Sequence, residues 1–581
     1  MPTQECFALL DDASDATPAR SRLYTGLSGE LVCQSFDAWP AVLAEMQAAL
    51  GRGLHAVPLL SYELGGKIVG VEPHPSTSLA HILLFERCEL LDHAQVAIWL
   101  AVRADGEPAG IAGVHANVDE AEFTRALGSV HDYIAAGDTY QVNYTYRLRF
   151  DAFGSLFDLY ARLRARQPVP YGALVALPDG SAIVSLSPEL FVRHSQGELT
   201  TRPMKGTAPA ASDDAENARR SAALAQDPKN RAENLMIVDL LRNDLGRVAV
   251  TGTVEVPALF DVQRYSSVLQ MTSTVRARLR PDAALSEIFD ALYPCGSITG
   301  APKRRTMEII RELEPAPRGI YTGAIGWFAP DGDFCLSVPI RTLVLQAPQH
   351  GVRAGELGVG AGIVFDSDAR DEYAECQLKA RFLTGLSNDF ELFETMYADH
   401  EGVRHLPLHL ARLEASARYF GFPFGAAPEM PACAAPTRLR LSLDQSGAFK
   451  IQTAALVPLD IPVRVLLADD ATQSDDLFLR HKTSVRTRYD GAWRAAVAQG
   501  AFDTLFFNER GELTEGGRSN VLAKIDGEWY TPPLSCGLLP GIMRSVLAAK
   551  ERIITRAELL AAQEVMLCNS LRGAMPALVV S

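Results

Sequence analysis

Short apolar runs alternate with glycine and proline breaks along roughly the first 115 residues. Runs such as AVPLLSYELGG and HILLFERCELL are typical of strands, and residues 38–50 have the spacing of one helix. An amphipathic helix is then predicted over 119–137, ending at Gly137, and GDTYQVNYTYRLRF alternates as a strand. Helices and strands mixed in this order predict an α/β (α+β) fold.

A different pattern fills residues 202–248, which read RPMKGTAPAASDDAENARRSAALAQDPKNRAENLMIVDLLRNDLGRV. Lys205 stands before a Gly-Thr turn, where no helix could continue. Asp213 offers an N-cap for an alanine-rich helix that ends at Asp227-Pro228. A second helix, roughly 231–243, is apolar almost all round and should be buried. It carries Glu233, and a buried carboxylate needs a partner such as a metal or a cationic group.

Two further polar positions lie at predicted breaks in apolar segments. Glu189 follows Ser187-Pro188 in SAIVSLSPELFVR, where proline indicates a bulge or a strand end. A lone glutamate is more often a surface residue, so this pattern alone leaves its role open. Thr299-Gly300 precede a helix in YPCGSITGAPKRRTMEIIREL, and a glycine-bearing helix start suits a carboxylate. An ordinary capped helix is the commoner explanation of that pattern.

The segment from Arg341 to Lys379 combines a lone cation, spaced glycines and a charged helix face. Arg341 is a cation on an apolar strand, which favours either a substrate-carboxylate clamp or a structural ion pair. Gly358, Gly360 and Gly362 are predicted to open a strand-to-helix turn. In the helix after Ser367, one face carries Glu372, Glu375 and Lys379, a trio that is most often solvated.

Composition then limits the class of protein. The chain has 581 residues, which suggests about two to four domains. Its net charge of −15 argues against a nucleic-acid partner, and its nine cysteines show no metal-binding spacing. The N-terminal sequence has no secretory pattern, and no apolar run is long enough to span a membrane. These features predict a cytoplasmic enzyme.

The motifs RPMKGT and RAENLMIVDLLRNDLGRV resemble the chorismate-utilising enzymes, and most of all aminodeoxychorismate synthase component I. The resemblance covers roughly residues 60–386. It implies a chorismate-binding two-sheet α/β sandwich over 1–386, with an N-terminal part over 1–115 and a catalytic part over 116–386. No glutaminase triad is found, so the resemblance implies a separate glutamine amidotransferase subunit as the ammonia donor.

The same resemblance implies roles for individual residues. Lys205 would be the nucleophile that adds to chorismate, and Glu189 would protonate the departing hydroxyl. Mg²⁺ would be held by Glu233, Glu375 and Glu372. The substrate would be bound by Arg341, Thr299, Gly300, Gly360, Ala361, Gly362 and Lys379. Two positions depart from the family: Gln270 replaces a histidine of many relatives, and Cys295 replaces a glycine.

The segment over 387–581 resembles fold-class IV pyridoxal-phosphate enzymes, and most of all aminodeoxychorismate lyase. The resemblance is carried by FELFETMYADHEGVRHLPLHLARLEASARYFGF, FLRHKTSVRTRYD and DTLFFNERGELTEGGRSNVLAKIDGEWYTPPLSCGLLPGIMR. It implies that Lys482 anchors pyridoxal 5′-phosphate and acts as a base, and that Glu515 contacts the ring nitrogen. The phosphate would be held by Arg412, Ser519, Asn520, Gly541 and Ile542. The segment is shorter than free-standing class IV enzymes at its N-terminal side.

Together the two resemblances predict a bifunctional enzyme that makes 4-aminobenzoate, a precursor of folate. Chorismate and ammonia would give aminodeoxychorismate, from which pyruvate is then eliminated. Two alternatives stay open. The C-terminal segment could be a true class IV aminotransferase, or it could be a docking module without a cofactor.

Overall fold

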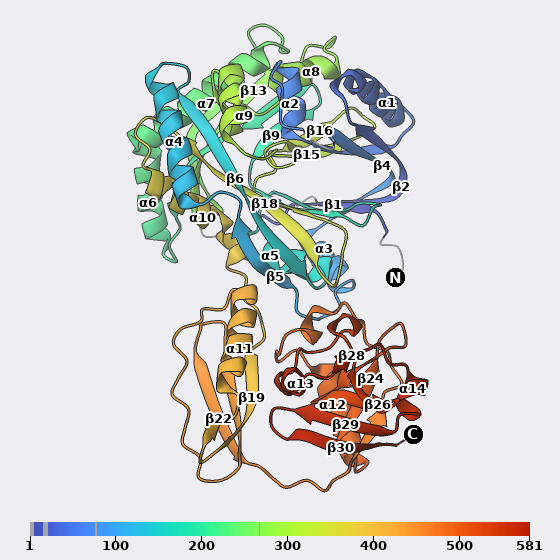
Figure 1. The fold of residues 1–581 in the computed structure, drawn as a ribbon. Helices are drawn as coiled ribbons and strands as arrows, with labels where there is room; N and C mark the ends of the chain where they lie inside the picture. The colour runs from blue at the N-terminus through green and yellow to red at the C-terminus, as the bar shows by residue number, and fades with distance from the viewer. Residues whose placement is uncertain (1–4, 15–20, 76–77, 266–267, 581) are drawn as a thin grey trace.

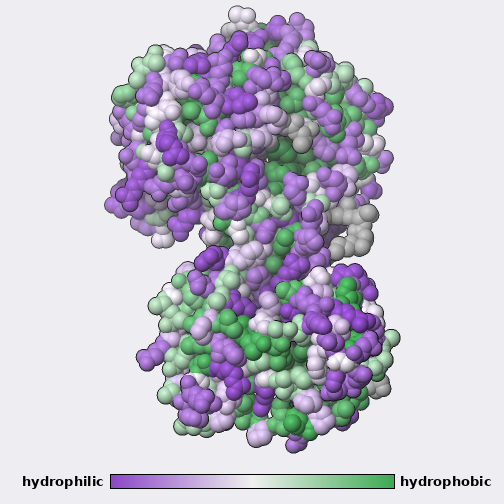
Figure 2. Space-filling model, viewed as in Figure 1, coloured by the Kyte–Doolittle hydropathy of each residue, from purple (hydrophilic) through white to green (hydrophobic). Residues whose placement is uncertain are grey.

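The computed structural model describes residues 5–14, 21–75, 78–265 and 268–580. Figure 1 shows a large upper body, blue to yellow, joined at a narrow waist to a lower body in orange and red. The upper body contains β1 to β18, and the lower body contains β19 to β30. No helix in the described ranges is long and apolar enough to cross a membrane. Figure 2 shows polar residues over most of the visible upper face and more apolar residues on the lower body.

The predicted helices form where capping residues and apolar spacing agree. The first is α1, Trp39–Gly51, and α4 covers Glu120–Ala135. Asp119 caps α4 by accepting a hydrogen bond from the backbone of Glu122, and Gly137 follows with a φ of 80°. In the central stretch, α6 covers Asp214–Gln226 and α7 covers Pro228–Gly246, with the break at Asp227 as predicted. The helix predicted over 231–243 is therefore longer at both ends.

Two long strands form the spine of the upper body. β6, Gln141–Phe153, and β18, Arg353–Ile363, are antiparallel neighbours along the whole of β18. Gly362 pairs with Asn143, and Gly360 pairs with Thr145. The short strand β14, Gly300–Ala301, pairs with the start of β6. The beginning of β6 therefore brings Thr299-Gly300 and the glycines of β18 to one place.

Strand pairing joins β1 to β18 into one network among the described residues. The expected mixed α/β fold with large sheets is confirmed, although the strands do not divide into two separately paired sheets. A large hydrophobic cluster fills the body and draws on β6, β18, α7 and α9, Lys303–Leu313. Burial of this cluster is the main stabilising contribution and fixes the strands that carry the polar site residues.

Two local predictions on β18 and its neighbour are wrong. Gly358, Gly360 and Gly362 lie inside β18 and do not open the turn after it. A side chain at Gly358 would overlap the ring of Tyr321, and one at Gly360 would overlap Thr145. Glycine at alternate positions therefore leaves room for these neighbours on one face of the strand. Arg341 does not lie on a strand either. It occupies the break between β16, Phe334–Ser337, and β17, Thr342–Leu345, with a φ of 54°.

The lower body has a small four-stranded sheet and a larger eight-stranded sheet within the described residues. The small sheet contains β19, Leu392–Asp399, and is covered by α11, Leu406–Phe420, which ends at Gly421 as predicted. The larger sheet contains β24, Asp503–Phe507, β25, Leu513–Gly516, and β26, Asn520–Ile525.

The waist between the two bodies is a packed interface. Phe153 at the end of β6 makes edge-to-face contacts with Phe390, Phe420 and Phe478. The hydroxyl of Tyr419 donates a hydrogen bond of 2.8 Å to Asp151. Aromatic packing and a hydrogen bond together hold the bodies in one arrangement.

Candidate active sites

The first site is built around Lys205 on β11, Met204–Pro209. Its Nζ lies 3.2 Å from Oε2 of Glu233, which projects from α7. Both side chains are mostly buried. A methyl group built on Gly362 would lie 2.5 Å from Lys205 Nζ, so the ammonium rests directly against the β18 backbone. Lys205 therefore contacts the carboxylate of Glu233 and the backbone of β18 at Gly362. Glu233 in turn has a cationic partner, as expected from the sequence.

Glu189 lies in the break between β8, Ala182–Ser187, and β9, Leu190–Ser195, and is only 5% exposed. The surface interpretation of this residue is therefore wrong. Ser297 donates a hydrogen bond of 2.6 Å to its Oε1. Burial raises the pKa of Glu189 to about 7, although Ser297 and the charge of Lys205 both oppose the rise. A carboxyl group that exchanges its proton near neutral pH can serve as a general acid.

Cys295, which replaces a family glycine, lies behind that hydrogen bond. Its Sγ is 3.1 Å from the hydroxyl oxygen of Ser297. Burial, and then the nearby Glu189, raise the pKa of the thiol to about 12. The thiol therefore stays protonated and can donate to Ser297 while Ser297 donates to Glu189. Gln270, the second departure, lies on β13, Val268–Arg278, and its side chain accepts from Thr207 at 3.1 Å.

The Thr299-Gly300 turn packs directly on β6. Gly300 has a φ of 150°, and a side chain there would lie 2.0 Å from the carbonyl oxygen of Gln141. The backbone amide of Asn143 donates to the Thr299 carbonyl at 2.9 Å. The helix begins at Lys303 and not at the proline before it. The amide of Gln141 is fully buried, and neither of its polar atoms has a partner within the described chain.

Arg341 is partly buried and forms no ion pair with a carboxylate in the described part of the chain. Burial lowers the pKa of its guanidinium to about 10. When the amide oxygen of Gln167 faces it, Arg341 Nε donates at 3.2 Å. The alternative of a structural ion pair is thus not observed, and the guanidinium retains donors for an anionic group.

Each of the predicted metal-binding carboxylates on α10 contacts a different protein group. Glu375 pairs with Lys379 at 2.7 Å on α10, Ala369–Thr384, and Glu372 accepts from Ser367 at 2.7 Å. Lys379 also donates to the Gly360 carbonyl at 2.9 Å. The charge of Lys205 affects the pKa of both Glu372 and Glu375, so the three carboxylates share one neighbourhood.

These residues therefore offer the type of ligand atom that Mg²⁺ needs, but they are not arranged as a metal site in this structure. Carboxylate oxygens are the ligands that Mg²⁺ prefers. However, no group of three metal-ligating side chains converges among the described residues. A metal held by Glu233, Glu372 and Glu375 would have to replace the contacts that Lys205 and Lys379 make with Glu233 and Glu375.

The second site is centred on Lys482. Its Nζ lies over the ring of Phe393, 4.9 Å from the centroid. Burial, then the charges of Arg486 and Arg412, lower the pKa of Lys482 to about 7. A lysine that loses its proton near neutral pH has the form required for a nucleophile and base. Arg486 was missed in the sequence, although it stands four residues after Lys482 in the same motif.

Glu515 lies at the end of β25 and is 5% exposed. Tyr489 donates to its Oε1 at 3.3 Å, and Asn520 donates to its Oε2 at 3.0 Å. Burial raises the pKa of Glu515 to about 8, against the influence of Arg486 and Lys482. Burial of a carboxyl group at this depth is unfavourable unless a cation or a nitrogen donor faces it.

Arg412 on α11 forms a bidentate pair with Glu394, through bonds of 2.8 and 2.6 Å, and donates to the Pro540 carbonyl at 2.9 Å. Burial would raise the pKa of Glu394, but Arg412 and His409 lower it to about 2. Because a guanidinium has five N–H donors, Arg412 can hold Glu394 and still donate to a phosphate.

The remaining residues of the predicted phosphate site differ in what they can offer. Asn520 packs against Gly541, where an added methyl group would lie 1.8 Å from its Oδ1. Ile542 begins α13, Ile542–Leu547. The hydroxyl of Ser519 donates to the buried Asp503 at 2.7 Å, so it is engaged in the core. Its predicted contact with a phosphate stays a prediction.

These residues fit pyridoxal phosphate in their donor chemistry. Lys482 supplies an amine with a lowered pKa, Glu515 a buried carboxyl group without an ion pair in the described chain, and Arg412 a cation. A cavity of about 430 Å³ reaches Glu515 and Arg486. Phe153 and Gly351 of the upper body also line it.

Comparison with known proteins follows the division between the two bodies. Residues 43–385 match the family described as chorismate binding enzyme, and residues 437–580 match amino-transferase class IV. Anthranilate synthase component 1 of Streptomyces coelicolor is 42% identical over 272 residues, 47% of this chain and 52% of that protein. Aminodeoxychorismate synthase component 1 of Klebsiella aerogenes is 42% identical over 260 residues, 45% of this chain and 56% of that protein.

A solved structure agrees with the upper fold. Anthranilate synthase component I from Streptococcus pneumoniae has a TM-score of 0.54 and 26% identity, and covers 63% of this chain and 93% of its own. The chain spans about half the length of the curated relatives that it matches.

Proposed function

The chain belongs to the chorismate binding enzymes, and from that premise we propose that it makes 4-aminobenzoate from chorismate and ammonia in two steps. The upper body would produce aminodeoxychorismate, and the lower body would eliminate pyruvate from it. The observation that carries the proposal is a lysine in each body with a matching environment: Lys205, whose charge acts on the buried acid Glu189, and Lys482, whose pKa is near neutrality. We place the boundary between the two activities after residue 386.

In the first step, Lys205 would attack C2 of chorismate. The ring double bonds shift, the bond between C4 and the hydroxyl breaks, and Glu189 supplies the proton that lets water leave. Ammonia then adds at C4, and the bond between C2 and Lys205 breaks. The pKa of Glu189, about 7, suits this proton transfer. Arg341 would bind one carboxylate of the substrate.

Mg²⁺ would neutralise the second carboxylate of the substrate when bound to Glu233, Glu372 and Glu375. The Gly360–Gly362 backbone, with Ala361 between the glycines, and the Thr299-Gly300 turn would line the same region. Lys379 already binds the Gly360 carbonyl and would hold that strand in place.

In the second step, pyridoxal phosphate would supply an electron sink. Lys482 would anchor it and then remove the C4 proton of aminodeoxychorismate, after which pyruvate leaves and the ring becomes aromatic. Glu515, oriented by Asn520 and Tyr489, would hold the ring nitrogen. Arg412 would hold the phosphate, with Glu394 fixing the direction of its guanidinium.

The ammonia donor is proposed to be a separate glutamine amidotransferase subunit, and the reaction is placed in the cytoplasm. In the described structure all nine cysteines are free, which supports a reducing compartment. The lowered pKa of Lys482 and the burial of Glu515 support a catalytic lower body over a docking module.

The decisive experiment incubates the purified chain with chorismate, Mg²⁺, ammonium and pyridoxal phosphate. We expect 4-aminobenzoate and pyruvate in equal amounts. Lys205→Ala should abolish their formation from chorismate but leave pyruvate release from supplied aminodeoxychorismate unchanged. Anthranilate as the product would contradict the synthase assignment. Amino-group exchange with an added amino acid, without pyruvate release, would favour a true aminotransferase.

A further inference from the structure

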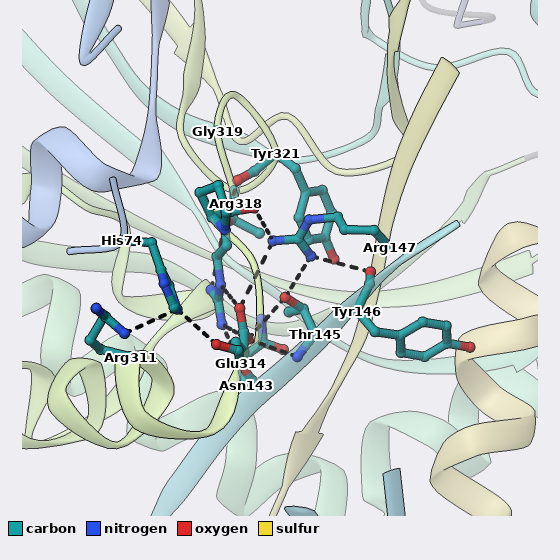
Figure 3. Close-up of polar contacts among 12 residues, drawn as sticks. His74, Asn143, Thr145, Tyr146, Arg147, Arg311, Glu314, Arg318, Gly319 and Tyr321 are labelled. Atoms are coloured by element: carbon teal, nitrogen blue, oxygen red, sulfur yellow. Dashed lines mark hydrogen bonds and ion pairs between the residues drawn. The ribbon is translucent and has the colours of Figure 1, made fainter. Parts of the chain in front are cut away.

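A buried cluster of charged residues lies on β6 behind the first site, outside the residues that contact substrate in the proposed function. Figure 3 shows its centre, where Glu314 and Arg318 face Arg147 and Thr145. Glu314 and Arg318 are each 3% exposed. Glu314 is the residue directly after α9, and Arg318 lies four residues further along the chain. A buried pair of this kind is weak evidence for stability alone, so its contacts decide what it does.

The guanidinium of Arg318 joins two separate segments. Its Nε and Nη2 hold Glu314 at 3.0 and 2.6 Å. Nη2 also donates to the Asn143 carbonyl at 2.6 Å, and Nη1 donates to the Ile298 carbonyl at 2.9 Å. Asn143 lies on β6, and Ile298 immediately precedes Thr299-Gly300. One planar group therefore fixes the distance between β6 and that turn.

Glu314 extends the same arrangement along β6. Its Oε1 accepts from the backbone amide of Thr145 at 2.8 Å and from the Thr145 hydroxyl at 2.9 Å. Asn143 and Thr145 are the strand partners of Gly362 and Gly360. Arg318 and Glu314 therefore bind the two β6 residues that pair with Gly362 and Gly360 of β18.

The N-terminal part closes the cluster from the other side. The carboxylate of Glu63 on α2, Tyr62–Ile68, accepts from the backbone amides of Arg318 and Gly319 at 2.7 and 3.0 Å. The ring of Tyr62 lies under the guanidinium, 4.4 Å from its centre. Arg318 is thus fixed at both its backbone and its side chain.

We propose that Arg318 and Glu314 are positioning residues, which hold the Thr299-Gly300 turn and the Gly360–Gly362 strand at the spacing that chorismate requires. The proposal rests on the function proposed above. Arginine is needed because its planar fork spans three acceptors in fixed directions, whereas the compact ammonium of lysine cannot. Displacing substrate-binding groups by about 1 Å can cost on the order of 100-fold in rate.

The test compares Arg318→Lys with a matched variant in the full chain. Arg164→Lys is the control, because Arg164 is also buried and bound to a carboxylate, Asp11, at 2.6 Å, but contacts no segment of the site. We expect Arg318→Lys to raise the KM for chorismate by about tenfold or more and to lower kcat. Pyruvate release from supplied aminodeoxychorismate should stay within about twofold of the parent in both variants, because the lower body has its own site.

An unchanged chorismate KM in Arg318→Lys, or an equal rise in Arg164→Lys, would overturn the proposal. If Arg318→Lys does not fold, Thr145→Val removes one hydrogen bond to Glu314 and the one that Arg147 donates to the Thr145 hydroxyl, and leaves the ion pair of Arg318 and Glu314 intact. It should raise the same KM by a smaller factor, and an unchanged KM there would also overturn the proposal. Failure of the proposed function is distinct, since the parent chain itself would then not aminate chorismate.

Discussion

The hydroxyl of Ser297 donates a hydrogen bond of 2.6 Å to Oε1 of Glu189, and it is the side-chain hydrogen bond that stabilises the ionised form of that buried acid. Burial raises the pKa of Glu189, whereas Ser297 and then the charge of Lys205 lower it, so the resulting value of about 7 is a balance of these opposing effects. Because this pKa is near neutrality, a fraction of Glu189 is protonated at neutral pH and can give its proton to the leaving hydroxyl.

Removing this hydrogen bond should shift the pH dependence of chorismate amination. Ser297→Ala leaves the carboxylate without its donor, so the pKa of Glu189 should rise by about one unit, since a hydrogen bond to a charged group contributes about 1.5 kcal/mol or more. The protonated form is the active acid. The loss of kcat at high pH should therefore occur at a higher pH than in the parent. Steady-state amination rates across pH measure this.

Ser185→Ala provides the control, because Ser185 is buried nearby but bonds to Thr342 at 2.8 Å. Its profile should match the parent. A basic limb that stays in place in Ser297→Ala, or moves to lower pH, would contradict the role of Glu189 as the acid.

Gly362→Ala should weaken the first activity without weakening the fold. The added methyl group would meet Lys205 Nζ at 2.5 Å, and that flexible end can move aside. Alanine within a strand costs less conformational entropy than glycine, so thermal stability should hold or rise slightly. The displaced amine should lower kcat for amination by roughly tenfold or more. Gly128→Ala, where an added methyl group meets nothing within 4 Å, should leave kcat unchanged. Parent-like kcat in Gly362→Ala would show that Lys205 does not act from this position.

Much of the site could be predicted because its residues lie in contiguous motifs. Lys205 and Glu189 occur beside breaks or turns that local sequence reveals, and Lys482 lies within the motif FLRHKTSVRTRYD. The position of Gly358 was predicted wrongly, because a glycine signals a turn unless a neighbour such as Tyr321 occupies the space of its side chain. That neighbour lies 37 positions away in the numbering, in the turn before β15, Ala324–Phe328, and is brought close only by the tertiary fold.

The contacts that orient the site could not be read from the sequence at all. Arg318 reaches Asn143 across 175 positions of the chain, and Ser297 reaches Glu189 across 108. Neither pair has a local pattern, since side-chain hydrogen bonds between distant segments depend on tertiary packing. Arg486 could have been found, because it shares a short motif with Lys482.

The metal prediction is tested by the charge on Glu375. Glu375→Gln keeps the shape of the side chain but removes a negative ligand, and it also frees Lys379 from its ion pair. The Mg²⁺ concentration needed for half-maximal amination should rise by about tenfold, while pyruvate release from supplied aminodeoxychorismate should not change. Glu198→Gln, an exposed glutamate paired with Arg276, serves as the control. Amination that is indifferent to both EDTA and Glu375→Gln would rule out the site.

Lys482→Ala tests the second activity most directly. The substitution removes both the anchor for pyridoxal phosphate and the base, so pyruvate release should fall by several orders of magnitude. The upper body does not use that cofactor, and the variant should accumulate aminodeoxychorismate from chorismate and ammonia. Lys524→Ala, which removes a lysine paired with Glu564, should behave as the parent. Glu515→Gln should keep cofactor absorbance but lose part of the rate, because an amide holds the ring nitrogen less firmly. If Lys482→Ala made 4-aminobenzoate at the parent rate, the lyase proposal would fail and the docking module would be favoured.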